Sequence, residues 1–111
     1  YGLRTLAPTD PEYRGHYGGN QWERDGAYHQ GTVWAWLIGC YIDAYLRVHE
    51  QNAEAKAHCR ALLQPLLDHT WDAGLGSISE IFDGDPPHLP KGTISQAWSV
   101  AEVLRAWEAC K

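Results

Sequence analysis

The sequence predicts an all-α fold of three helices joined by long loops. Three stretches, residues 32–49, 52–70 and 94–109, carry apolar residues at the three- and four-residue spacing of an amphipathic helix. No stretch shows the convincing alternation of apolar and polar residues that marks a half-buried strand. Residues 1–30 and 71–92 are rich in Gly and Pro and show no period. The expected order is loop, helix, helix, loop, helix, packed as a small bundle.

The first loop, residues 1–30, contains several Tyr side chains and Trp22, so we expect it to be ordered and packed. Long loops in compact domains are usually either functional or disordered. The helix that follows, residues 32–49, begins at Thr32, whose hydroxyl can cap a helix N-terminus. Its apolar stripe consists of Val33, Leu37, Cys40, Ala44 and Val48.

The second predicted helix, residues 52–70, has a Leu-rich apolar stripe. Pro65 lies inside it and should kink the helix or end its regular hydrogen bonding. The third helix, residues 94–109, follows a loop with several prolines. Thr93 and Gln96 have the spacing of a capping box at its start.

Length and charge exclude several classes of protein. The 111 residues fit one small domain, and the chain opens at Tyr1 without any Met, so we expect a fragment or one end of a longer protein. A net charge of −5 gives no basic surface for nucleic acid. No apolar run approaches the ~20 residues that a membrane span needs, and no N-terminal signal segment is present.

The three cysteines are widely spaced and odd in number, which favours neither a disulfide framework nor a zinc motif. All of them fall within helical patterns, so we expect buried free thiols. This usage favours a reducing cytoplasm as the location. The residues concerned are Cys40, Cys59 and Cys110.

A first candidate site lies between residues 21 and 34, where charged and aromatic side chains precede an apolar helix. Gly31 would let the backbone approach a ligand closely. Six Trp and six Tyr residues are typical of sugar-binding proteins, because pyranose C–H faces stack on aromatic rings, but a Trp-rich core explains them equally well. The functional interpretation is a sugar subsite, and the alternative is a polar turn with a structural histidine. The subsite would be lined by Tyr28, His29, Gln30 and Trp34.

A second candidate is Glu80, which lies between the apolar residues Ile78, Ile81 and Phe82. A carboxylate among apolar neighbours is costly unless it has partners or a task. The acidic residues that follow resemble a calcium loop only superficially, because the other ligands of such a loop are absent. They form an expected turn of Asp83, Gly84 and Asp85.

A third candidate, at the start of the last helix, comprises Gln96 and Trp98. Gln96 could hold a substrate hydroxyl, or it could complete the capping box with Thr93. The residues alone favour the cap.

Taken together and in this order, these motifs resemble the bacterial glycogen debranching enzyme family, the amylo-α-1,6-glucosidases. The resemblance covers nearly the whole chain, except for a nondescript stretch at about residues 50–72. Ala35 departs from the family, which more often has Pro there. The motifs are Gly2-Leu3-Arg4-Thr5-Leu6, Gln21-Trp22-Glu23-Arg24-Asp25, Ala27-Tyr28-His29-Gln30-Gly31-Thr32-Val33-Trp34-Ala35-Trp36, Gly76-Ser77-Ile78-Ser79-Glu80-Ile81-Phe82-Asp83-Gly84-Asp85 and Gln96-Ala97-Trp98-Ser99-Val100-Ala101-Glu102.

The resemblance implies an (α/α)6 toroid, of which residues 1–111 would form the C-terminal portion, with about three helices and long loops. It implies inverting hydrolysis of α-1,6-linked glucose at glycogen or limit-dextrin branch points. Such enzymes use two carboxyl groups about 6.5–9.5 Å apart and need no cofactor. Glu80 matches the family's general base, and the general acid would lie outside this chain. The glucan substrate and the rest of the glucosidase domain are the expected partners.

The same resemblance implies a sugar-binding wall of Tyr28, His29, Gln30, Trp34, Gln96 and Trp98. Two other hypotheses remain open at this point. The chain could be a non-catalytic carbohydrate-binding helical module that uses the same aromatic residues. It could also be a plain helical domain without activity. A fragment of a larger fold exposes apolar helix faces, so we expect the isolated piece to be inactive and to self-associate.

Overall fold

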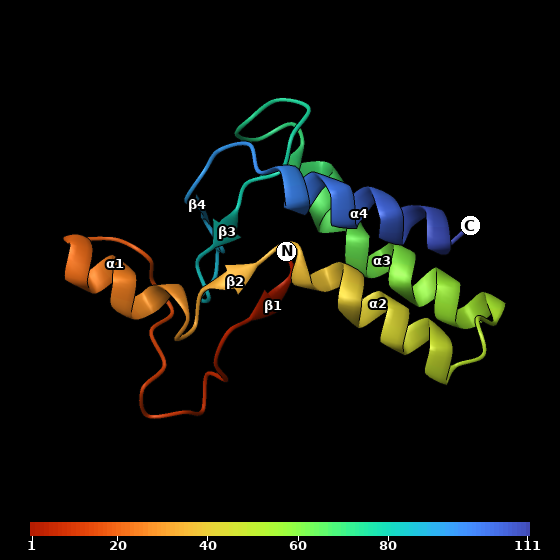
Figure 1. The fold of residues 1–111 in the computed structure, drawn as a ribbon, viewed down its shortest axis with the longest axis horizontal. Coiled ribbons are helices and arrows are strands. Elements are labelled where there is room, and N and C mark those ends of the chain that lie inside the picture. The colour runs from red at the N-terminus through yellow and green to blue at the C-terminus, as the bar shows by residue number, and fades with distance from the viewer.

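The computed structural model describes residues 1–111 as four helices and four very short strands. Figure 1 shows three helices lying side by side, with α1 set apart at the opposite end and the strands between them. In chain order the elements are β1 (Leu3–Arg4), α1 (Gln21–Tyr28), β2 (Val33–Trp34), α2 (Leu37–Val48), α3 (Ala53–His69), β3 (Ile81–Phe82), β4 (Pro90–Lys91) and α4 (Ala97–Ala109).

The strands form one antiparallel sheet in the order β1-β2-β3-β4, so the fold is mixed α/β. The prediction of an all-α fold, the C-terminal portion of an (α/α)6 toroid with about three helices, is therefore wrong. Each strand has only two residues, too few for an alternating pattern, which needs about four to eight. Both residues of β2 and both residues of β3 are buried, which removes the alternation altogether.

The three predicted helices exist with shifted ends. The first begins at Leu37, because the residues before it form β2 and a turn. Thr32 does not cap it; the Thr32 hydroxyl donates a hydrogen bond to the Ala27 carbonyl instead. α3 continues through Pro65 to His69. α4 begins one residue after its N-cap, Gln96, so Thr93 is not part of a capping box.

The helix α1 lies in the stretch that the sequence predicts as loop. Only Ala27 of α1 is buried, so the helix has no apolar stripe by which periodicity could reveal it. Its sequence signal is a capping box formed by Asn20 and Glu23. The Asn20 side chain accepts from the Glu23 backbone N–H, and the Glu23 carboxylate accepts from the Asn20 backbone N–H.

The hydrophobic core lies between α2, α3 and α4 and reaches the sheet through Val33 and Phe82. α4 packs chiefly on α2, and both contact α3. None of the four helices combines the length and hydropathy that a bilayer crossing requires. The buried core residues are Val33, Ala35, Ile38, Ile42, Leu46, Ala55, Cys59, Leu63, Leu66, Ile78, Phe82, Val103, Ala106 and Cys110.

All three cysteines are free, but only Cys59 and Cys110 are buried, so the expectation of burial is wrong for Cys40. Cys40 is exposed because it lies on the outer side of α2. Burial raises the pKa of the Cys59 thiol to about 11. Burial also raises the pKa of Cys110.

We expect one thiol of the folded protein to react rapidly with an aromatic disulfide reagent at neutral pH, because only the thiolate of an accessible cysteine attacks it. Cys40 is that thiol, and the other two react only on unfolding. Counting the released chromophore before and after adding denaturant checks this. A Cys40→Ser variant should lose the rapid phase, and a second rapidly reacting thiol would contradict the assigned burial.

Candidate active site

Glu80 is the residue directly before β3, and its half-buried carboxylate has two hydrogen-bond donors. The Tyr28 hydroxyl donates to Oε1 at 2.5 Å, and the Thr93 backbone N–H donates to Oε2 at 3.1 Å. The Glu80 backbone N–H in turn donates to the Thr93 carbonyl at 2.9 Å. These contacts fix both the position and the orientation of the carboxylate.

Gly92 keeps the space beside this carboxylate open. A Cβ atom at Gly92 would lie 2.4 Å from Glu80 Oε2, and the residue has a φ of +68°, which other residues rarely adopt. The approach of residues 92 and 93 to Glu80 therefore depends on glycine at this position.

Tyr28 is the last residue of α1 and acts as the donor in its contact with Glu80. Burial raises the pKa of its hydroxyl above the usual value near 10, and the hydrogen bond to Glu80 raises this pKa further. The phenol therefore keeps its proton at neutral pH, and a carboxylate oxygen is the acceptor.

An aromatic cluster adjoins the Tyr28–Glu80 pair. The Trp34 ring lies 4.6 Å from the Tyr28 ring, and the Trp34 indole N–H donates to the Tyr28 carbonyl. His29 stacks on Trp34 with centroids 5.5 Å apart, and Trp98 meets Trp34 at 6.0 Å. Trp36 stacks on Trp98 at 5.5 Å.

A cavity of about 250 Å³ with a mainly apolar wall is lined by the rings of His29, Trp34, Trp36 and Trp98, together with Thr5 and Leu37. Such a cavity offers flat faces on which the C–H side of a sugar ring can stack. The structure therefore brings four of the predicted site residues together around one space or next to it: Tyr28, His29, Trp34 and Trp98.

The two predicted glutamines take part in backbone contacts instead. The Gln30 carbonyl accepts from the Arg14 backbone N–H. Gln96 caps α4, with its side-chain oxygen accepting from the Ala97 N–H at 3.1 Å. Its own N–H donates to the Ile78 carbonyl, so it ties the start of α4 to the segment that carries Glu80. Neither lines the aromatic cavity.

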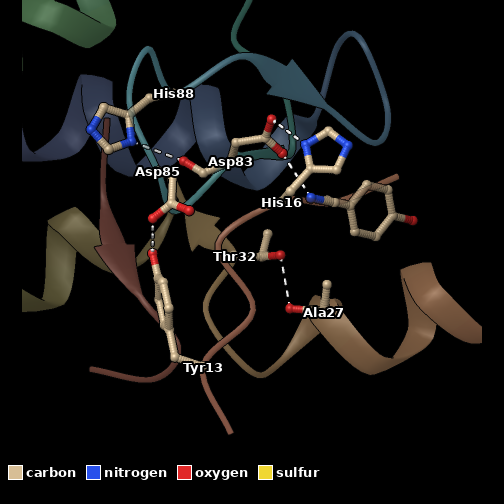
Figure 2. Close-up of polar contacts among 8 residues, drawn as sticks. Tyr13, His16, Ala27, Thr32, Asp83, Asp85 and His88 are labelled. Atoms are coloured by element: carbon tan, nitrogen blue, oxygen red, sulfur yellow. Dashed lines mark hydrogen bonds and ion pairs between the residues drawn. The ribbon is translucent and has the colours of Figure 1, made fainter. Parts of the chain in front are cut away.

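The turn after β3 holds a buried carboxylate that sequence patterns do not reveal. Figure 2 shows Asp83 facing His16. His16 Nδ1 lies 3.0 Å from Asp83 Oδ2, and the Tyr17 N–H donates to Oδ1 at 2.8 Å. The Tyr13 hydroxyl donates to Asp85 on the other side of the turn. The partners are more than 65 positions apart, so no local pattern could have found them.

Two glycines permit this turn to approach the loop that precedes β2. A Cβ atom at Gly84 would lie 2.3 Å from the Gly31 carbonyl oxygen. One at Gly31, where φ is +141°, would lie 2.3 Å from the Arg14 carbonyl oxygen. The sequence predicts that Gly31 allows a ligand to approach the backbone. In the structure it is the backbone of Arg14 that lies close to Gly31.

A buried imidazole supports the segment that leads into Glu80. His69, the last residue of α3, is 1% exposed. Its Nε2 accepts from the Ser79 backbone N–H at 3.3 Å and lies 3.1 Å from the Ser79 hydroxyl. Its Nδ1 lies 3.5 Å from an Asp72 carboxylate oxygen. The neutral tautomer with the proton on Nδ1 satisfies all of these contacts.

We expect the folded protein to lose stability as the pH falls from about 7 towards 5. Burial lowers the pKa of His69, although the hydrogen bond to Asp72 opposes that shift and the charged Tyr1 amino group adds to it. The imidazole of the unfolded chain, with a pKa of about 6.5, therefore binds a proton more readily than the folded one. Below that pH, proton binding stabilises the unfolded state, and the free energy of unfolding falls. Thermal unfolding midpoints measured across this range check the effect.

A His69→Gln variant keeps an acceptor near the Nε2 position and cannot titrate, so its unfolding midpoint should vary less over this pH range. His58→Gln is a matched control, because His58 is exposed on α3. An equal pH dependence in the wild type and the His69→Gln variant would contradict the assignment.

Comparisons with known proteins give matches of two kinds, to a family model and to individual relatives. Residues 1–105 match the family model described as Amylo-alpha-1,6-glucosidase. A protein from Saccharomyces cerevisiae called Glycogen debranching enzyme is 30% identical over 122 aligned residues, which cover 93% of this chain and 8% of the yeast protein. The chain thus spans a small part of the length of this relative. No solved structure gives a significant match.

Proposed function

This chain belongs to the amylo-α-1,6-glucosidase family, and we propose that it is part of a glycoside hydrolase that removes α-1,6-linked glucose from glycogen or limit dextrin. In this proposal residues 1–111 form the C-terminal part of the catalytic domain. The observation that carries it is the Glu80 carboxylate, held by Tyr28 beside a cavity lined with tryptophan.

Glu80 acts as the general base of an inverting hydrolysis. Each carboxylate oxygen can accept two hydrogen bonds. Tyr28 and the Thr93 N–H occupy one position on each, so a position remains free on each oxygen to accept a proton from water. The two donors hold the carboxylate so that it needs no reorientation when the water attacks the sugar.

The general acid comes from outside this chain. In inverting enzymes the second carboxyl group lies about 6.5–9.5 Å from the base, across the sugar ring. Two acidic residues of this chain are engaged in other contacts: Asp83 is buried with both oxygens accepting hydrogen bonds, and one carboxylate oxygen of Glu23 accepts from the Asn20 N–H at the start of α1.

The aromatic cavity binds the sugar. Trp36 and Trp98, which are less buried than Trp34, supply the faces for stacking, and His29 supplies a polar edge. Gln30 and Gln96 were predicted to bind the sugar directly. We propose instead that their backbone and capping contacts hold the segments next to the cavity.

The test is release of free glucose from a branched limit dextrin, for the chain alone and for a longer protein that includes it. We expect glucose from the longer protein only. Glucose release by the chain alone would contradict the proposal that the general acid lies outside this chain. Asp25 or Glu23 would then be the candidates for the general acid. Glucan binding by the chain, with no glucose from either protein, would favour a non-catalytic carbohydrate-binding module, which the tryptophan-lined cavity also fits.

A further inference from the structure

A second cavity, of about 580 Å³, lies on the side of the molecule formed by the Arg14–Gly19 loop. Its volume falls in the range of about 300–1,000 Å³ that is usual for ligand sites. No hydrophobic residue lines it, so it differs from the tryptophan-lined cavity. Its charged and titratable lining consists of Arg14, His16, Glu23 and Asp85, and its remaining walls are Gly15, Gly18 and Gly19.

His16 is held in this cavity by a buried partner. Asp83, whose side chain is only 7% exposed, accepts a hydrogen bond from His16 Nδ1, while the His16 side chain is 68% exposed. A carboxylate has no hydrogen to donate, so Nδ1 carries the proton and Nε2 is left without a partner. A buried carboxylate that orients an exposed imidazole presents the second nitrogen in a fixed direction.

Gly18 leaves room for the His16 ring at this position. A Cβ atom there would lie 2.5 Å from His16 Nε2, so a larger residue would displace the exposed imidazole from this position. Asp85 is anchored as well, because its Oδ1 accepts from the Tyr13 hydroxyl and its backbone N–H donates to the Gly15 carbonyl. The polar groups of the cavity are therefore positioned before any ligand arrives.

The balance of charge indicates the class of ligand. Glu23 and Asp85 repel an anion, and Arg14 repels a cation. Both donors and acceptors are present, which suits a neutral molecule with many hydroxyl groups, since each hydroxyl both donates and accepts. Such a molecule can be bound by hydrogen bonds to its hydroxyl groups, without stacking of its C–H face on a tryptophan or tyrosine ring.

Two tyrosines link the cavity to the proposed catalytic carboxylate. His16 and Gly18 flank Tyr17, and the Tyr17 ring packs against the Tyr28 ring at 5.6 Å. The hydroxyl of Tyr28 in turn donates to Glu80. The path from the cavity to Glu80 therefore runs along the Tyr17 and Tyr28 rings.

We propose that this cavity is a second glucan-binding site, in which His16 accepts a hydrogen bond from a hydroxyl of the chain that bears the α-1,6 branch. The proposal rests on the proposed function of the Glu80 site and assigns His16 and Asp85 to binding the neighbouring glucose units.

Maltopentaose, a linear glucan without a branch, is the probe, and its Kd is measured by calorimetry in a longer, folded protein that includes this chain. Loss of one hydrogen bond of about 1 kcal/mol corresponds to a rise in Kd of about fivefold. His16→Ala should show this rise. Gly18→Ala keeps the imidazole but displaces it, so it should weaken binding too. His58→Ala, which changes an exposed histidine on α3, is the matched control with an unchanged Kd.

A second readout is the ratio of kcat/KM for a branched dextrin to kcat/KM for isomaltose, which has the α-1,6 bond without a main chain. Both His16→Ala and Gly18→Ala should lower this ratio about fivefold. Unchanged Kd and unchanged ratio in both variants would overturn the proposal. Failure of the proposed function is a different result, namely normal turnover in Glu80→Gln.

Discussion

Glu80→Gln should lower kcat for glucose release from a branched limit dextrin by about 10²–10⁴-fold while leaving glucan binding intact. General-base catalysis contributes a factor of this size, and an amide cannot take the proton from water. The side chain keeps its shape: the amide oxygen can accept from the Thr93 N–H, and the amide N–H can donate to the Tyr28 oxygen. Glucose assays and calorimetric titration with a non-cleaved glucan, in an active protein containing this chain, measure the two effects.

Tyr28→Phe is the informative companion to this variant. It removes the donor to Glu80 Oε1 but leaves the carboxylate and the Thr93 contact in place. We expect a smaller loss in kcat, about tenfold, because a mispositioned base still accepts a proton. Tyr41→Phe, an exposed tyrosine on α2, is the control. Near-normal turnover in Glu80→Gln would end the assignment of Glu80 as the base.

Phe82→Ala should destabilise the folded chain by about 3–5 kcal/mol, the usual cost of truncating a buried phenylalanine. Phe82 has no exposed surface, and its ring lies 4.8 Å from both the Tyr1 ring and the His69 ring. It belongs to both the sheet and the helical core, so the cavity left behind cannot be filled by moving one element. Thermal unfolding should show a midpoint lower by more than about 10 °C.

The matched control for this change is Leu104→Ala on α4. Leu104 is 61% exposed, so its truncation should change stability by no more than about 0.5 kcal/mol. A Phe82→Ala variant that unfolds at the same temperature as Leu104→Ala would mean that the core does not extend into the sheet.

The sequence predicted the helical core well because α2, α3 and α4 bury apolar stripes with helical spacing. It predicted α3 most closely, where Asn52 caps the helix as its residue type favours. It could not predict the sheet, since the pairing of two-residue strands is decided by contacts between distant loops. α1 was missed because it buries little, although its capping box was present in the sequence.

The candidate site was predictable in part for a similar reason. Glu80 was noticeable because it is acidic among apolar residues, and the aromatic residues were noticeable because of their number. The hydrogen bond between Tyr28 and Glu80 could not be predicted, because the two residues are 52 positions apart. The same holds for His16 and Asp83, which are 67 positions apart. Neither pair leaves a spacing pattern that periodicity can detect.

The short sheet ties together segments from nearly the whole length of the chain, and the Arg4 side chain donates to the Gly84 carbonyl across 80 positions. Closing such long loops costs more entropy and takes longer than packing neighbouring helices such as α2 and α3. During synthesis Tyr28 is made before Glu80, so their hydrogen bond cannot form until the chain has been extended to Glu80. We therefore expect the hydrogen bond between Tyr28 and Glu80 to form only after the chain has been made beyond α3.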